Sequence, residues 1–182
     1  MDNPDNAAGL ARAMPKVLLH EHLDGSLRAA TLFELLQSRG LARPAADVAG
    51  LARWFDERAH AGSLTEYLRG FDLTVAAMAT PAGLERVAFE AAEDAREDGC
   101  VLAEFRIAPL LFEAHGVAGE AAVEALLAGL ARSALPSGLI VCAMRHLPEA
   151  QTLRAAELSL HYQDLGVVGF DLAGAEVGHP PA

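Results

Sequence analysis

The feature that most constrains the fold of this 182-residue chain is the alternation of short apolar runs with longer helical patterns. Four runs have the length of buried β-strands and are bounded by turn residues, at 16–22, 100–107, 139–144 and 167–172. The segments between them place apolar residues at helical spacing, as in the segment that Thr80-Pro81 opens and Gly99 closes. Connections of this length join parallel strands, so the sequence predicts an α/β fold.

The connection after the first strand is the longest, and it contains further helical patterns at 47–60 and 64–79. The segment at and just after the end of the first strand, HEHLDGS, has no run of small residues that could cradle a phosphate. A (β/α)8 TIM barrel therefore fits better than an open doubly wound sheet, and four of its eight units are present. We expect a tail or helix at 1–14 and, at 15–182, an N-terminal half-barrel with extra helices inserted after the first strand, truncated before the fifth strand.

The charge and cysteine content exclude several classes of protein. Lys and Arg number 14 against 25 Asp and Glu, a formal charge of −11, which argues against binding to nucleic acid or to a membrane surface. The N-terminus lacks a signal-peptide pattern, and the most apolar stretch, 121–131, is too short to span a bilayer. Cys100 and Cys142 are expected to be buried free thiols, so we expect a cytoplasmic protein. The sequence leaves the oligomeric state open.

The strongest candidate for a functional site is His20-Glu21-His22 at the end of the first strand. Side chains two apart on a regular strand share one face, so both imidazoles should point the same way, as two ligands of one metal must. Barrel enzymes keep their sites at the carboxyl ends of the strands, where these histidines and Asp24 lie. We expect Glu104 and Arg106, which share a face of the second strand, to form a structural ion pair. His60, His115 and His161 are expected to be solvated or packed.

Residues 15–28, PKVLLHEHLDGSLR, resemble the opening signature of the adenosine deaminase family, a branch of the metal-dependent amidohydrolases. The resemblance continues through SLTEYLRGFDLTVAAM, AEFRIAP, VCAMRH and VVGFDLAGAE in the family's order and spacing, to the end of the chain. A sibling branch that bridges two metals through a carboxylated lysine is disfavoured, because the only lysine, Lys16, precedes the histidines.

The resemblance implies a role for each matching residue. His20 and His22 bind one zinc ion, and His22 also lies against a purine nucleoside. Asp24 bonds a ribose hydroxyl, and Gly174 lets the purine ring approach the backbone and bonds it. The resemblance further implies a lid helix over the apolar side of the pocket, carrying Leu64, Tyr67, Leu68 and Phe71. The implied reaction is hydrolysis of adenosine or deoxyadenosine at purine C6, with release of ammonia.

The sequence also departs from the family's pattern. The family's other members also carry a His-Ala-Gly-Glu-like segment, which supplies a third histidine and a glutamate, together with a further histidine and an Asp-Asp pair. None of these features is present in these 182 residues. We therefore expect no catalytic acid within this chain and no activity from it alone. Two alternatives stay open. One is a deaminase of another 6-aminopurine nucleoside or of adenine, and the other is a non-catalytic remnant.

Overall fold

The computed structural model describes residues 9–11, 13–60, 62 and 64–179, and the side chains of 64–69 are outside that description. The elements run in the order β1 (Lys16–His22), α2 (Ala29–Ser38), α3 (Val48–Ala59), α4 (Leu64–Met78), α5 (Pro81–Glu97), β2 (Cys100–Ile107), η1 (Pro109–His115), α6 (Gly119–Ala131), β3 (Ser137–Met144), α7 (Glu149–His161), η2 (Gln163–Leu165) and β4 (Val167–Ala173). The predicted segment at 1–14 lies largely outside the described residues, and its division from the barrel domain stays a prediction.

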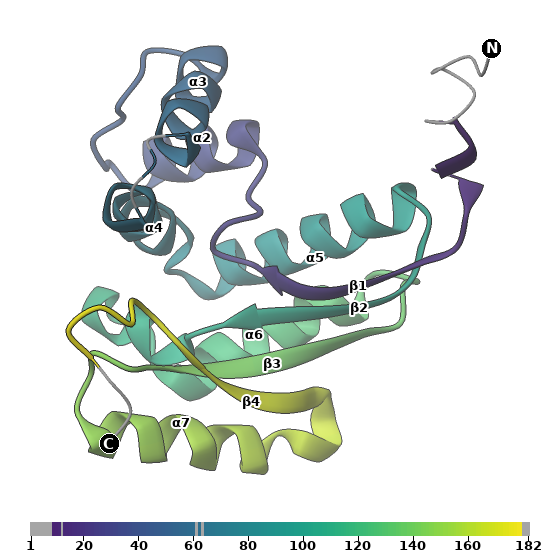
Figure 1. The fold of residues 1–182 in the computed structure, drawn as a ribbon, viewed down its shortest axis with the longest axis vertical. Coiled ribbons are helices and arrows are strands. Elements are labelled where there is room, and N and C mark those ends of the chain that lie inside the picture. Colours follow the sequence, from purple (N-terminus) through teal and green to yellow (C-terminus); the bar gives the residue numbers. More distant parts are fainter. Residues whose placement is uncertain (1–8, 12, 61, 63, 180–182) are drawn as a thin grey trace.

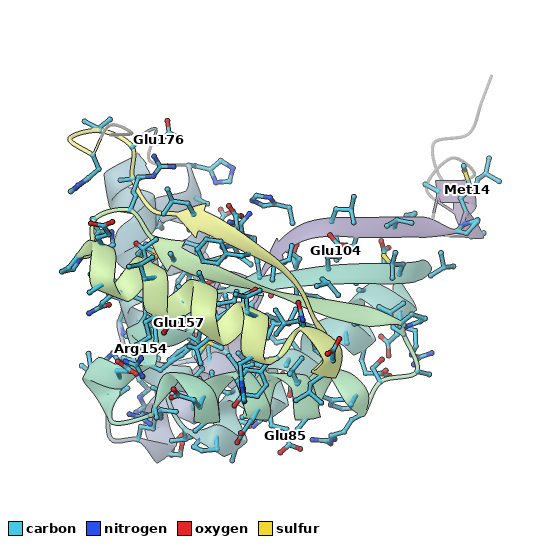
Figure 2. All side chains as sticks on the ribbon, turned by 90° about the horizontal axis from the view of Figure 1, so that it is seen from below. Met14, Glu85, Glu104, Arg154, Glu157 and Glu176 are labelled. Carbon is cyan, nitrogen blue, oxygen red and sulfur yellow. The ribbon has the colours of Figure 1, made fainter. Side chains whose placement is uncertain are left out.

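The four strands form one sheet in the order β1-β2-β3-β4, and every neighbouring pair is parallel. The α/β class and the half-barrel topology are thereby confirmed. Helices α5, α6 and α7 pack along the sheet, whereas α2, α3 and α4 gather beyond the carboxyl end of β1 (Figure 1). Figure 2 shows the helices that carry Glu85, Arg154 and Glu157 together on one side of the strands. The extra helices after the first strand thus stand at the end of the sheet where the candidate site was expected.

The core lies between the sheet and the helices that cover it. Phe105 of β2 and Leu139 of β3 are fully buried there, as are Leu84 of α5 and Leu126 of α6. Helices α5 and α6 approach closely at Gly129, where an added Cβ would lie 2.2 Å from the carbonyl oxygen of Glu85. A helix pair this close leaves no room for a side chain at that position.

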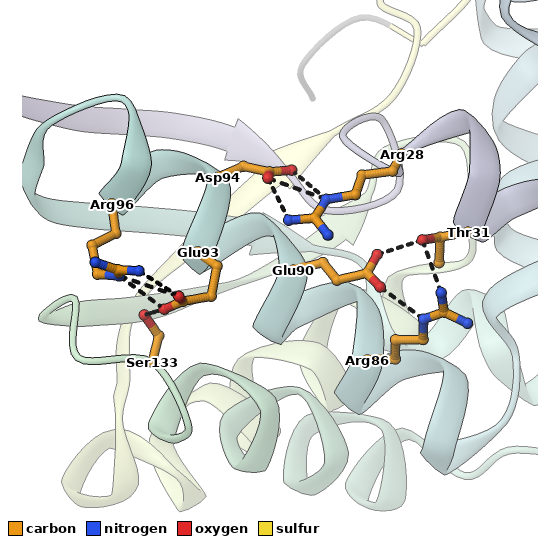
Figure 3. A network of polar contacts seen from close by, with 8 residues as sticks. All are labelled: Arg28, Thr31, Arg86, Glu90, Glu93, Asp94, Arg96 and Ser133. Atoms are coloured by element: carbon orange, nitrogen blue, oxygen red, sulfur yellow. Dashed lines mark hydrogen bonds and ion pairs between the residues drawn. The ribbon is translucent and has the colours of Figure 1, made fainter. Parts of the chain in front are cut away.

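A polar network joins the inserted helix α2 to α5 (Figure 3). Arg28 holds Asp94 through two donors, and Thr31 donates to Glu90 at 2.5 Å. Arg86 also bonds Glu90, at 2.7 Å. These contacts fix the start of α2 against the barrel helix, and the loop between β1 and α2, which carries Asp24, is held at both ends.

The same network continues along α5 to the start of the loop before β3. Glu93 accepts hydrogen bonds from Arg96 and, at 2.6 Å, from Ser133. These bonds lower the pKa of the Glu93 carboxyl to about 2, with the Arg96 bond as the largest cause.

No helix among the described residues is long and apolar enough to cross a membrane.

Candidate active site

The carboxyl ends of the strands surround a cavity of about 690 Å³. Its walls come from the end of β1, helix α4, the η1 segment, and the loops after β3 and β4. His22, Asp24 and Gly174, the three residues expected to contact a nucleoside, all line this cavity. Its volume falls within the range of small-molecule sites, and most of its lining is apolar, which is the usual composition of such a pocket.

The two histidines of β1 lie close together, but regular strand alternation does not bring them there. The pairing of β1 with β2 shifts register between Leu18 and Glu21, so the strand is irregular at His20. His20 has a φ of 73°, which no other non-glycine residue in the described part of the chain shares in sign. The ring centroids of His20 and His22 are nevertheless 5.3 Å apart, with their planes at 58°. The expectation of a regular strand was wrong, because the backbone of His20 leaves the extended conformation where the register of β1 against β2 shifts.

The spacing of the two rings can be compared with that of metal-bound imidazoles. Two imidazoles that share one tetrahedral zinc ion have ring centres about 5 Å apart. The separation of 5.3 Å fits two positions of such a site. Within the described ranges, no group of three or more His, Cys, Asp or Glu side chains is placed to hold a metal. The two imidazoles alone do not complete a four-coordinate metal site within those ranges.

A buried arginine lies beneath the histidines. Arg106 of β2 is 3% exposed, and its Nη1 is 2.7 Å from both ring nitrogens of His20. Its Nη2 pairs with Asp171 of β4. The expected ion pair between Glu104 and Arg106 was therefore wrong. Residues two apart on a strand are about 7 Å apart, whereas the long guanidinium side chain reaches across β3 to a carboxylate on the next strand.

Cys142 of β3 lies beside this cross-strand pair. It is in register with Asp171, and it is 2% exposed. Burial raises the pKa of the Cys142 thiol to about 11, although the neighbouring Arg106 opposes that shift. The thiol therefore stays protonated at neutral pH, as expected for a buried cysteine, whereas Cys100 is half-buried.

Asp24 presents an unsatisfied oxygen at the cavity. The residue is 7% exposed, and its Oδ1 has no hydrogen-bond partner. Its distance to Nδ1 of His22 is 3.7 Å, too long for a hydrogen bond. An unpaired buried carboxylate oxygen is costly in free energy. Oδ1 of Asp24 can therefore accept a hydrogen bond from a donor that enters the cavity.

Gly174 closes the cavity on the β4 side. Its φ of 100° lies in the left-handed region that favours glycine. An added Cβ would also lie 3.3 Å from Nδ1 of His146 and 3.4 Å from Cγ of Arg145. Backbone conformation and crowding together favour glycine here, and the backbone itself forms the cavity wall.

Other residues also line the cavity. His115 is exposed, in agreement with the expectation that it is solvated or packed, and it lines the cavity together with Asp72 and His146. The signal for His115 was its place in the η1 segment, which directly follows the carboxyl end of β2. Phe71 of α4 also lines the cavity, and its ring centroid is 6.4 Å from that of His22. The side chains of the other expected lid residues (Leu64, Tyr67, Leu68) lie outside the described residues.

The fold and the site together define a half (β/α)8 barrel that carries two adjacent imidazoles at its carboxyl mouth, the end at which barrel enzymes keep their active sites. The family model described as "Adenosine deaminase" matches residues 15–182. The chain therefore belongs to the adenosine deaminase family, as the resemblance indicated.

Curated relatives agree over nearly the whole chain. A protein named adenosine deaminase from Mycobacterium avium (strain 104) is 46% identical over 180 residues, which cover 93% of this chain and 49% of the relative. Its namesake from Mycobacterium leprae (strain TN) is 44% identical over 191 residues, covering 100% of this chain and 52% of the relative. The chain spans about half the length of the curated relatives that it matches.

Solved structures show the same correspondence. The Arabidopsis N6-mAMP deaminase superposes with a TM-score of 0.77 at 27% identity, covering 94% of this chain and 52% of that one. An amidohydrolase from Burkholderia ambifaria, solved with bound zinc, superposes with a TM-score of 0.85 over 100% of this chain and 50% of that one. At 23% identity, the second comparison supports the fold alone.

Proposed function

We propose that this chain supplies the N-terminal half of the active site of a zinc-dependent purine nucleoside deaminase, which hydrolyses adenosine or deoxyadenosine to the inosine nucleoside and ammonia. The observation that carries the proposal is the convergence of His22, Asp24 and Gly174 on one cavity, with His20 beside His22. The relatives named adenosine deaminase, at 44–46% identity, support the same reaction.

The residues of this chain have distinct tasks in the proposal. His20 and His22 hold one zinc ion, whose chemistry in hydrolases is the activation of water at neutral pH. Asp24 accepts a hydrogen bond from a ribose hydroxyl through its unpaired Oδ1. Gly174 brings backbone polar groups to the purine edge. Phe71 and the other apolar lining residues exclude water from the purine face.

The proposal also includes an expectation for this polypeptide alone. Zinc deaminases use a glutamate as general acid and base. Among the described residues, Asp24 and Asp72 are the only ones that bring carboxyl groups to the cavity. In our proposal Asp24 is engaged by the ribose, and Asp72 is assigned no catalytic role. We infer that the 182 residues do not catalyse deamination without further groups.

The test is a complementation assay. The chain is mixed with zinc and with the second half of the Mycobacterium avium relative, made as a separate polypeptide, and loss of adenosine absorbance is followed. We expect no turnover from this chain alone and measurable turnover from the mixture. His20→Ala should reduce the mixture's rate at least about 100-fold, because the metal loses a ligand. Asp24→Ala should lower kcat/KM at least about tenfold, because a hydrogen bond to a charged group is lost.

The matched control is His60→Ala, which removes an exposed histidine outside the cavity and should leave the rate unchanged. Turnover by this chain alone would refute the need for further groups. Turnover of the mixture that survives His20→Ala would refute the assigned site.

The same assay separates the alternative substrates. Asp24 favours a ribose-bearing substrate, so adenosine should outcompete adenine and the preference should shrink in Asp24→Ala. A preference for adenine, or for another 6-aminopurine nucleoside, would select the alternative deaminase. A mixture that assembles but hydrolyses none of these purines would support the alternative of a non-catalytic remnant.

The cytoplasmic location of the protein stays a prediction.

A further inference from the structure

We propose that Phe71 separates the nucleoside cavity from a second pocket, and that this pocket accepts an apolar chain carried by the ribose of a substrate. Phe71 is in this proposal a specificity-determining residue, because its ring keeps such a chain out. The inference rests on the proposed function, since it takes the larger cavity as the nucleoside site. It adds a ligand class for a pocket that the proposed function does not use.

The second pocket lies among the helices inserted after β1. Its volume is about 270 Å³, and its walls come from α2, α3, α4 and the loop between β1 and α2. Figure 1 shows these three helices gathered beyond the carboxyl end of β1. A cavity needs only roughly 10–15 Å³ to hold one water molecule, so this pocket has room for a short chain of carbon atoms.

Two residues line both the pocket and the nucleoside cavity. Among the described residues only Asp24 and Phe71 are common to the two linings. Asp24 is assigned to a ribose hydroxyl in the proposed function, whereas Gly174, which is assigned to the purine, lines the cavity and not the pocket. The pocket therefore adjoins the cavity on the side of the ribose.

The ring of Phe71 forms the partition between the two spaces. Its centroid is 6.4 Å from that of His22, which lines the cavity and not the pocket. The same ring lies against Gly25, which lines the pocket and not the cavity, because a Cβ added at Gly25 would be 3.3 Å from Cζ of Phe71. A smaller side chain at position 71 would join the two spaces.

The lining of the pocket selects the chemistry of the chain. Leu32 and Phe55 supply apolar walls. Arg58 is the one cation among the described lining residues, and its guanidinium lies 3.5 Å from the ring centroid of Trp54 and donates to the Trp54 carbonyl at 3.2 Å. Because Arg58 is already stacked and bonded, an uncharged apolar chain fits this pocket better than an anionic group.

The test compares two substrates in the complemented mixture with zinc. The probe is 5′-deoxy-5′-propylthioadenosine, because the 5′ carbon lies outside the sugar ring and can carry a chain away from it. With the natural chain, kcat/KM should favour adenosine. Phe71→Ala should raise the ratio of kcat/KM for the probe to that for adenosine at least about tenfold, the scale of placing carbon atoms in an apolar pocket.

A second substitution shows where the chain goes. Ala52 lines the pocket from α3 and does not line the nucleoside cavity, so Ala52→Phe fills the pocket alone. The gain of Phe71→Ala should disappear when Ala52→Phe is added. Thermal unfolding followed by circular dichroism checks that the variants are folded, and Phe71→Leu, which removes less packing, repeats the comparison if Phe71→Ala unfolds.

The outcomes separate the inference from the proposed function. An unchanged ratio in a position-71 variant that still hydrolyses adenosine would overturn the partition. A gain that survives Ala52→Phe would put the chain outside the pocket and would also overturn the inference. Both results leave the proposed function intact, whereas a mixture that hydrolyses adenosine with no variant and not with the natural chain overturns both.

Discussion

The 182-residue chain is expected to elute from a sizing column as dimers or larger species at micromolar concentration. Strands β1 and β4 each have one hydrogen-bonded neighbour, so each leaves an edge unpaired. Large apolar side chains on the sheet are also exposed, among them Leu19 at 59%, Val168 at 57% and Phe170 at 44%. Open edges beside exposed apolar side chains favour pairing with other chains.

Light scattering on the eluted peak measures this association. Phe170→Lys puts a charge on the edge strand and should shift the chain toward the monomer. The matched control is Leu160→Lys on α7, where a leucine that is 67% exposed lies away from the sheet, and the oligomer should persist. A natural chain that stays monomeric at every concentration and unfolds in one cooperative step would show that the sheet needs no partner.

Gly129→Val should destabilise the chain by at least about 3 kcal/mol, the upper part of the usual cost of overpacking a core. The reason is geometric: the added Cβ would lie 2.2 Å from the carbonyl oxygen of Glu85 and 2.8 Å from the Cβ of Ala88. Backbone cannot yield as a flexible side chain does. Helices α5 and α6 would have to separate, and the core between them would lose its close packing.

Urea denaturation gives the free energy of unfolding for the variant and for its control. Ala128→Val changes the adjacent, exposed position of the same helix, so it should cost only about 0.5 kcal/mol through helix propensity. Equal losses in the two variants would mean that propensity, and not the contact with α5, sets the stability at Gly129.

Much of the fold could be predicted because its signals are local. The strand at 100–107 has the same limits in the structure, and the helix predicted after Thr80-Pro81 begins at Pro81, with Thr80 Oγ1 accepting from the N–H of Gly83. Other limits cannot be read from the apolar spacing: the helical segment after β3 breaks at Tyr162 into α7 and a short 3-10 turn. Its apolar pattern continues past the point where the chain turns toward β4.

The details of the site depended on contacts between distant strands, which a single sequence does not display. The irregularity at His20 coincides with the register shift of β1 against β2, and no residue at that position signals it. The partner of Arg106 lies 65 positions away on β4, so the nearer Glu104 was the natural but mistaken choice. His115 lines the cavity from η1, directly after the carboxyl end of β2, and its exposure alone did not mark it as a cavity residue.

The central claim is that His20 and His22 coordinate one divalent cation beside Asp24 and Gly174. X-ray absorption at the zinc edge measures it most directly, because the spectrum reports the number of imidazoles bound to each ion. We predict two imidazoles per zinc in the natural chain, one in His22→Ala, and two in the control His161→Ala. A spectrum without imidazole ligands, or one that His22→Ala leaves unchanged, would contradict the account.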